Sequence, residues 1–183
     1  MIYNKTMVIL RGMRESDVDD YVRWFTSETE WSEKWDTPWE GKIQGDPVEE
    51  RKSWMEYFSS VKSLDDDTER WKFEIEANGR HIGWVSSYYD LDYSDNPDHI
   101  IAVGIDIPEI DARGKGFGTK ALSLFLEYLK GKGHTSFFIQ TWSKNAPMLK
   151  VIKKLGFKEF VRKRGFRLVD GKKCDAITFL LRG

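Results

Sequence analysis

Three glycines at alternate positions stand among basic residues in the stretch ARGKGFGTKAL, residues 112–122, just before an apolar run. Glycine lets the backbone come close to a bulky anion. The first amides of a helix bind phosphate groups, because these amides have no partner in the helix and carry a partial positive charge. The stretch therefore predicts a phosphate-binding loop that leads into a helix.

Three kinds of phosphate loop compete for this stretch. A P-loop requires Lys-Ser/Thr after a correctly spaced glycine, whereas residues 118–120 read Gly-Thr-Lys. The dinucleotide fingerprint G-x-G-x-x-G/A fits residues 116–121, but five residues separate the preceding strand from the loop, and the next strand, 136–141, ends without a ribose-binding acid. The third pattern, [QR]-x-x-G-x-[GA], fits residues 113–118 in an agreeing context of strand, loop and helix.

This third pattern resembles the pyrophosphate loop of the GNAT superfamily of acetyl-CoA-dependent N-acetyltransferases. Downstream, NAPMLKVIKKLGF (145–157) is similar to the second motif of that family, and VILRGMRESDVDDYVRWF (8–25) is similar to the start of its RimJ/RimL-like branch. The resemblance covers almost the whole chain. It implies one GNAT domain over residues 1–183, of class α/β (α+β), with a mixed central sheet of about seven strands and about four helices.

The resemblance also implies acetyl-CoA as the co-substrate and assigns residues to it. In the family, the parallel strands around the loop separate, and the pantetheine lies in the gap as a surrogate strand. By resemblance, backbone groups of Ile105 and Ile107 and the side chain of Asn145 would hold the pantetheine, while the loop holds the pyrophosphate. The residues expected to bind the co-substrate are Ile105, Ile107, Arg113, Gly114, Lys115, Gly116, Phe117, Gly118, Thr119 and Asn145.

Asp106 is the candidate general base. Acetyl transfer to an amine needs a neutral nucleophile, and family members usually attack the thioester directly. Asp106 is the one charge in AVGIDIP, at the end of a central strand, and a carboxylate in an apolar strand is costly unless it is paired or functional. The segment GID resembles aminoglycoside 6′-N-acetyltransferases, in which an aspartate here is the proposed base. The alternative is that Asp106 faces solvent or caps a turn.

The general acid is missing from its usual places in the family. Many GNAT enzymes carry a tyrosine seven residues after the asparagine, where this chain has Ile152, and RimJ/RimL-like members often carry a serine where it has Met148. Ser143, Tyr88 or a water molecule remain candidates. The sole cysteine, Cys174, lies far from the loop in the sequence, and we expect a small core-facing strand residue rather than a nucleophile.

The segment ETEWSEKWDTPWE, residues 28–40, combines three tryptophans with five carboxylates. In the family, the region after the first helix forms one wall of the acceptor pocket. Aromatic faces and carboxylates together favour a cationic amine. Trp31, Trp35, Trp39 and Tyr88 are therefore candidate acceptor-binding residues. The alternative is that these tryptophans only anchor the helix to the core.

The elements that must position these residues follow from the hydrophobic pattern. WKFEIEA, residues 71–77, alternates between an apolar face and a face that carries Lys72, Glu74 and Glu76. Asn78-Gly79 then predicts a type I′ hairpin turn, and residues 99–107 are apolar enough for a central strand covered on both faces. Together with a helix capped by Ser16, the pattern predicts the order β-α-α-β-β-β-α-β-α-β-β, antiparallel first and parallel in the middle.

Composition sets the remaining bounds. The 29 basic and 30 acidic residues balance, so their totals predict neither a nucleic-acid nor a membrane partner. However, residues 15–50 hold twelve acids against three bases, and residues 113–183 hold seventeen bases against four acids. The three histidines lack metal-ligand spacing, so no metal is expected, and the single cysteine favours an intracellular, cytoplasmic protein. We expect a monomer or homodimer.

These observations lead to one main hypothesis about function and one alternative. The main hypothesis is an N-acetyltransferase that moves an acetyl group from acetyl-CoA to a primary amine by direct attack. The acceptor would be a protein N-terminal amine, a polyamine or another small cationic amine. The alternative is a CoA-binding or acyl-CoA-binding module without transferase activity, which the missing general acid favours.

Overall fold

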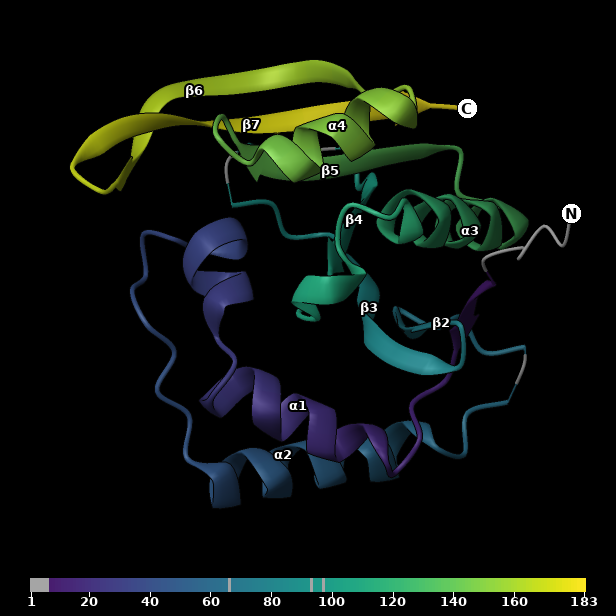
Figure 1. Cartoon of the computed structure of the whole chain (residues 1–183). Coiled ribbons are helices and arrows are strands. Elements are labelled where there is room, and N and C mark those ends of the chain that lie inside the picture. Colours follow the sequence, from purple (N-terminus) through teal and green to yellow (C-terminus); the bar gives the residue numbers. More distant parts are fainter. Residues whose placement is uncertain (1–6, 66, 93, 97) are drawn as a thin grey trace, which may run out of the picture.

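The computed structural model describes residues 7–183 apart from 66, 93 and 97, and within them the strands form one seven-stranded sheet (Figure 1). The strand order is β1-β2-β3-β4-β5-β7-β6. The strands are β1 (Val8–Arg11), β2 (Lys72–Ala77), β3 (Arg80–Tyr88), β4 (Ile101–Asp106), β5 (Ser136–Trp142), β6 (Lys158–Val169) and β7 (Lys172–Arg182). The helices are α1 (Asp17–Thr26), α2 (Pro47–Val61), α3 (Phe117–Gly131) and α4 (Ala146–Lys154), with short turns η1 (Ser32–Asp36) and η2 (Ile110–Ala112). This element order and the mixed sheet confirm the predicted fold.

The centre of the sheet is where β4 and β5 separate. Strands β1 to β4 pair antiparallel, whereas β4 and β5 pair in parallel. This pairing extends over only two positions, Ile101 with Phe137 and Ala102 with Phe138. Beyond them β4 continues to Asp106 and β5 to Trp142 without pairing to each other. The carboxyl ends of the two strands are therefore free to border a site, as the resemblance implies.

Different helices cover the two faces of the sheet. Apolar side chains of α3 and α4 pack with the sheet residues Ile75, Val85, Val103 and Phe137 in the main core. Helices α1 and α2 pack against each other and cover the opposite face of the β2–β4 half (Figure 1), where Trp84 joins their aromatic side chains. None of the helices in the described part of the chain has the length and apolarity needed to cross a bilayer.

The predicted turn at Asn78-Gly79 is confirmed, and the predicted side-chain cap by Ser16 is wrong. Asn78 and Gly79 have φ of 53° and 81°, as a type I′ turn requires, and the Asp46 carboxylate caps α2. Gly156 follows α4 with φ of 84°, the left-handed conformation typical of a helix end. Ser16, however, makes no side-chain capping bond. The first amides of α1, those of Asp17 and Val18, donate instead to the carbonyl oxygens of Arg14 and Glu15 (3.0 and 3.1 Å).

The polar face of β2 is buried. Lys72 is 9% exposed and Glu74 1% exposed, because the aromatic side chains of α1 and α2 cover this face. Trp71, expected on the apolar face, precedes the strand and is exposed. The alternation of residue types was therefore predicted correctly, but both faces of the strand lie inside the protein.

A network of charged hydrogen bonds satisfies part of this buried polar face. The Tyr21 hydroxyl donates to the Glu74 carboxylate (2.6 Å), and His81 donates from Nε2 to Glu74 and from Nδ1 to Asp20 (2.9 Å each). Although burial opposes the charged form, hydrogen bonds to Asp20 and Glu74 and the charges of Glu74 and Asp17 raise the pKa of His81 to about 9. His81 is therefore protonated at neutral pH.

We predict that His81→Gln destabilises the fold by about 3–5 kcal/mol at pH 6, because it removes one partner of a buried ion pair. The pKa of His81 is about 9 in the folded protein against 6.5 for the model side chain. Its stabilising effect is thus fully present below pH 6.5 and is lost as the pH rises through 9. Urea unfolding at several pH values measures the difference between wild type and variant.

The control for this prediction is His134→Gln. His134 pairs with Glu69 near the surface (2.9 Å), so its loss should cost at most about 1 kcal/mol. If the His81→Gln difference in unfolding free energy stayed constant from pH 6 to pH 9.5, the network would not hold a histidinium.

Candidate active site

The glycine loop presents a row of unpaired amides. Gly114 and Gly116 take left-handed conformations with φ of 74° and 86°, and Gly116 directly precedes α3. Among the hydrogen bonds of the described residues, none has a backbone amide of 114–119 as its donor. A Cβ atom built on Gly114 or Gly116 would meet no atom within 4 Å, so the space beside them is open. Such a loop at a helix start is suited to bind a pyrophosphate.

The third glycine of the motif lets α3 pack closely on the end of β4. A Cβ atom on Gly118 would lie 3.3 Å from Ile107 Cδ1 and 3.5 Å from Ile105 Cδ1. The Phe117 side chain is buried in the core, so we expect it to contact the co-substrate through its amide. The side chain of Thr119 is half-buried, and that of Lys115 is exposed at the loop.

Arg113 braces the loop with its side chain. Its guanidinium donates to the carbonyl oxygens of Ile107 and Pro108 (2.8 Å each) and to the Glu30 carboxylate (2.6 Å). These bonds tie the loop to the end of β4 and to the acid-rich segment after α1. The Arg113 side chain is thus already engaged within the protein, and we expect its role in binding to be indirect.

The gap between the strands is bordered by Ile105 and by Asn145. Ile105 pairs with Val85 of β3 and has no strand partner on the β5 side. Asn145 precedes α4, and its side-chain oxygen accepts from the Met148 amide (3.1 Å). Its side-chain nitrogen donates to the Trp35 carbonyl oxygen (2.9 Å). This side chain therefore orients α4 and holds η1, in addition to any contact with the pantetheine.

Trp35 thus has a role that the sequence did not reveal. Its carbonyl oxygen accepts from both Asn145 and Trp142 Nε1 (2.9 Å each). These two bonds fasten η1, whose last residue is Asp36, to the junction of β5 and α4. The acid-rich segment is thereby held against the separated strand end.

Asp106 stands at the end of β4, where its Cα pairs with that of Trp84 in β3. Gly83 permits this close approach, since a Cβ atom there would lie 2.0 Å from the Asp106 carbonyl oxygen. Burial, with the nearby Asp36 carboxylate, raises the pKa of Asp106 well above its ordinary value, while the charge of Lys72 lowers it. A carboxyl group with a raised pKa suits proton abstraction near neutral pH.

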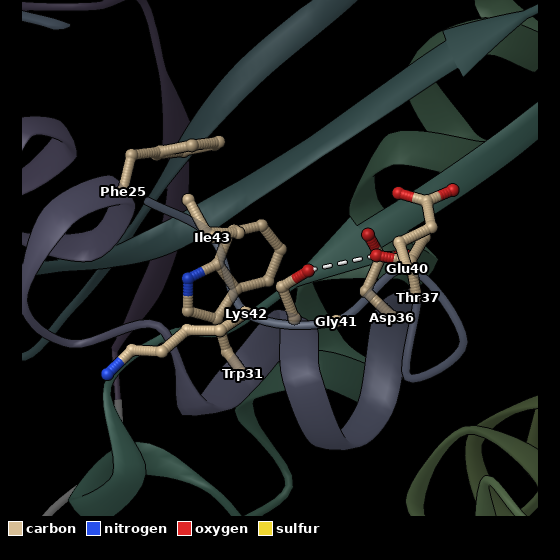
Figure 2. A pocket seen from close by; sticks show the side chains of 9 residues that line it. Phe25, Trp31, Asp36, Thr37, Glu40, Gly41, Lys42 and Ile43 are labelled. Carbon is tan, nitrogen blue, oxygen red and sulfur yellow. Dashed lines mark hydrogen bonds between the residues drawn. The ribbon is translucent and has the colours of Figure 1, made fainter. Parts of the chain in front are cut away.

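Asp36 brings further negative charge to the site. Asp36 remains accessible to solvent, but protein atoms surround its carboxylate. These surroundings, together with the charges of Glu40 and Asp92, raise the pKa of Asp36 to about 6. Asp36 and Glu40 line an open cavity of about 360 Å³. Figure 2 shows the apolar side chains of Phe25, Trp31 and Ile43 toward one end of this cavity and the two carboxylates toward the other.

The three candidate tryptophans have different surroundings. Trp31 is buried, donates from Nε1 to the Trp24 carbonyl oxygen (3.0 Å), and also lines the cavity. Trp35 and Trp39 are not among the residues that line it. Trp39 packs edge-on against Trp142, with the Arg167 guanidinium 4.6 Å from its ring centroid.

One candidate proton donor ends a strand and the other follows one. Tyr88 is exposed at the end of β3, and its Cε1 atom lies 3.7 Å from where a Cβ of Gly104 would be. Tyr88 is thus on the same sheet face as Gly104 and Asp106 of β4, and Asp106 follows Gly104 by two residues. Ser143 follows β5, and its hydroxyl oxygen accepts from the Asp175 amide (3.0 Å). Cys174 is 1% exposed, the core position expected of it.

The fold brings together one cluster that sequence spacing could not show. Ligand atoms of Asp17, Asp20 and His81 lie within 4.8 Å of one another. Arg11 donates two hydrogen bonds to Asp17 (2.6 and 2.8 Å), and Arg23 pairs with Asp20 (2.8 Å). These arginines already neutralise the carboxylates, so the cluster fits the buried ion network described above.

Comparisons with known proteins agree with this geometry. Residues 7–158 match the family described as Acetyltransferase (GNAT) domain. The chain therefore belongs to the GNAT family, and as a member of it the protein is an acetyl-CoA-dependent N-acetyltransferase. No curated protein matches the sequence.

Solved structures of the same fold include enzymes of the expected branch. RimL, a ribosomal L7/L12 α-N-protein acetyltransferase in complex with coenzyme A, matches with 16% identity and a TM-score of 0.71, over 98% of this chain and 95% of that one. RimJ of Mycobacterium smegmatis, in complex with CoA-disulfide, matches with 20% identity and a TM-score of 0.70, over 96% and 82%. YncA of Salmonella typhimurium, a putative acetyltransferase with acetyl-CoA, matches with 16% identity and a TM-score of 0.68, over 96% and 94%.

We predict that Gly116→Ala weakens CoA binding by about tenfold, because a side chain in the left-handed conformation costs ~1–2 kcal/mol and the loop must change shape to avoid it. Isothermal titration calorimetry with CoA measures the effect. The matched control is Gly79→Ala, since Gly79 has φ of 81°, open space around its Cβ position, and a place in the β2–β3 turn. Equal CoA affinity in the two variants would contradict a role for the loop conformation in binding.

Proposed function

We propose that this enzyme acetylates a cationic primary amine by direct attack, with Asp106 as the general base. The observation that supports this most strongly is the position of Asp106. Its carboxyl group, with a raised pKa, stands at the end of β4, where β4 and β5 separate. In the direct reaction one proton of the ammonium passes to the Asp106 carboxylate, and the neutral amine nitrogen then attacks the thioester carbonyl carbon. The carbon–sulfur bond breaks, and the nitrogen gives its second proton to solvent as the amide forms.

The charge of the site favours a cationic acceptor. Asp36 interacts electrostatically with Asp106 on one side and with Glu40 and Asp92 on the other. Carboxylates that lie close together repel one another, and a cation bound between them offsets this repulsion. A primary amine on a protein N-terminus, a polyamine or another small cationic molecule would supply this cation, and the aromatic wall formed by Phe25 and Trp31 would contact its apolar part.

The proton for the departing thiolate has two protein candidates in this proposal. Tyr88 shares the sheet face of Asp106 and is exposed, so its hydroxyl is accessible from the acceptor side. The Ser143 hydroxyl follows the end of β5 and uses its oxygen as an acceptor for Asp175, which leaves its hydrogen to donate. A water molecule in the open cavity would serve equally.

We predict that the wild-type protein releases CoA thiol from acetyl-CoA in the presence of members of an amine panel, and that Asp106→Asn lowers kcat about 100-fold on the best of them, as expected for loss of a general base. A thiol-reactive chromophore measures the rate. The control Asp19→Asn changes an exposed residue of α1 that pairs with Arg51, and its kcat should equal that of the wild type. Full turnover by Asp106→Asn would remove Asp106 from the mechanism. Tight CoA binding with no turnover on any amine would instead favour the binding module.

We also predict that Asp36→Asn raises KM for a dicationic amine by about tenfold, since one charge–charge contact near a protein surface contributes on the order of 1–2 kcal/mol. CoA affinity should not change, because Asp36 belongs to the acceptor side. Steady-state kinetics with polyamines and with a neutral-tailed amine separate the two effects, and Glu56→Gln on exposed α2 is the control. An unchanged KM for every cationic amine would contradict the proposed acceptor site.

A further inference from the structure

Lys72 is a lysine enclosed by aromatic rings beside the candidate base. Its Nζ atom lies 4.3 Å from the ring centroid of Tyr21, 4.5 Å from that of Trp54, 5.0 Å from that of Trp84 and 5.1 Å from that of Tyr57. These rings come from α1, α2 and β3. Aromatic faces attract an ammonium, and the attraction grows when water is excluded. The protein thus holds its own cation in an aromatic cage.

The register of the sheet places this cage next to Asp106. Lys72 pairs with Ser86, and Trp84 pairs with Asp106, so Lys72 and Asp106 lie on one sheet face with β3 between them. The Trp84 indole belongs to the cage and stands in the row of Asp106. The two charged groups interact, since Lys72 lowers the pKa of Asp106 and Asp106 raises that of Lys72.

No salt bridge within 4 Å joins Lys72 to a carboxylate among the described residues. The nearest acid on its own strand, Glu74, is bonded instead by Tyr21 and His81. The charge of Lys72 is therefore not neutralised by a contact pair, and its field extends to Asp106. Burial in the cage lowers the pKa of Lys72 to about 8, so the ammonium is present at neutral pH.

The groups that act on the pair come from several elements, and Arg70, near Tyr57, and Arg11, paired with Asp17, lie one contact farther away. The cage contains Tyr21 of α1 and Tyr57 of α2, and the charges that act on Lys72 come from Glu74 of β2, Asp17 of α1 and Asp106 of β4. His81 of β3 reaches this group through Glu74. Those that act on Asp106 are Asp36 of η1 and Lys72. Lys72 is thus the cation that opposes the effects of burial and of Asp36 on the base.

We propose that Lys72 is a positioning residue for acetyl transfer, whose caged ammonium on the sheet face of Asp106 favours the ionised, proton-accepting form of that carboxyl group. This inference rests on the proposed role of Asp106 as the base. Without the ammonium, burial and the neighbouring Asp36 would act on Asp106 unopposed, so a smaller fraction of Asp106 would be ionised at a given pH. The enzyme would then fold and bind CoA but would need a higher pH for the same activity.

The test is the pH dependence of kcat/KM, which reports the ionisation of essential groups in the free enzyme. Methionine has a similar length to lysine and no charge. For Lys72→Met we expect the acid limb, the rise of kcat/KM with pH as the base ionises, to move to a pH about one unit higher. The kcat/KM at pH 6.5 should then fall about tenfold and return to the wild-type value by pH 9. Lys72→Arg keeps the charge, and its acid limb should stay within about 0.3 pH unit of the wild type even if kcat falls. Asp36→Asn should move the limb in the opposite direction.

The control is Lys132→Met. Lys132 is exposed and lies 5.8 Å from the ring centroid of Tyr128 on α3, so its loss should leave the profile unchanged. A uniform loss of activity in Lys72→Met with the acid limb at its wild-type pH would mean that Lys72 only supports the structure, and would overturn the inference. Asp106→Asn tests the base separately, because it should abolish the limb whether or not Lys72 acts on it.

A measurement on the wild type tests whether Lys72 affects the ionisation of Asp106 even if Lys72→Met does not fold. Carboxyl carbons of 13C-labelled aspartate are followed by NMR, and the Asp106 signal is assigned by its absence in Asp106→Asn. Because interacting groups perturb each other's titration, the Asp106 signal should show a second inflection near pH 8, where Lys72 loses its proton. A single inflection with no change near pH 8 would overturn the inference.

Discussion

The candidate active site depends on how little of β4 pairs with β5. Two paired positions join the strands, and their remaining residues diverge toward Asp106 and Trp142. An unpaired strand edge inside a protein leaves backbone groups that need partners, and here that edge faces the start of α3 and the glycine loop. Asp106, the proposed base, is the last residue of the part of β4 that does not pair with β5. The glycine loop and the proposed base therefore both adjoin one interruption of the sheet.

A second constraint is the burial of polar groups on the face of β2 to β4 that α1 and α2 cover. Glu74, His81 and Lys72 are each less than 10% exposed, and buried charges are stable only when hydrogen bonds or other charges satisfy them. Glu74 and His81 satisfy each other, whereas Lys72 is surrounded by aromatic rings. The covered face thus contains interacting charged groups as well as packed aromatic side chains. Asp106 lies on the same sheet face as Lys72 and Glu74, and its ionisation depends on Asp36 and Lys72, which are distant from it in the sequence.

Local features were predicted well because short-range physics decides them. A glycine with positive φ, a proline after Asp46 and the Asn-Gly turn each require one backbone conformation, and the structure has all three. The core side of α3 also follows from its apolar period. The prediction for Ser16 was wrong because backbone carbonyls of Arg14 and Glu15 accept from the first amides of α1, in a turn where Asp17 binds both the Arg14 amide and Arg11 of β1. Such competition between backbone and side-chain acceptors depends on the geometry of the turn, which a local pattern of residue types does not contain.

By itself the sequence determined the family and the element order and predicted the co-substrate loop, since these follow from residue types at fixed short spacings. The tertiary structure alone decided the surroundings of the charges. It placed Asp36 beside Asp106, fastened Trp35 to Asn145, and enclosed Lys72 in four rings from three elements. The alternation in β2 shows which residues share a face, but it does not show whether that face meets water or another layer of protein. The reason is physical, because the energy of a charge depends on everything within several ångströms of it, and most of those neighbours are remote in the chain.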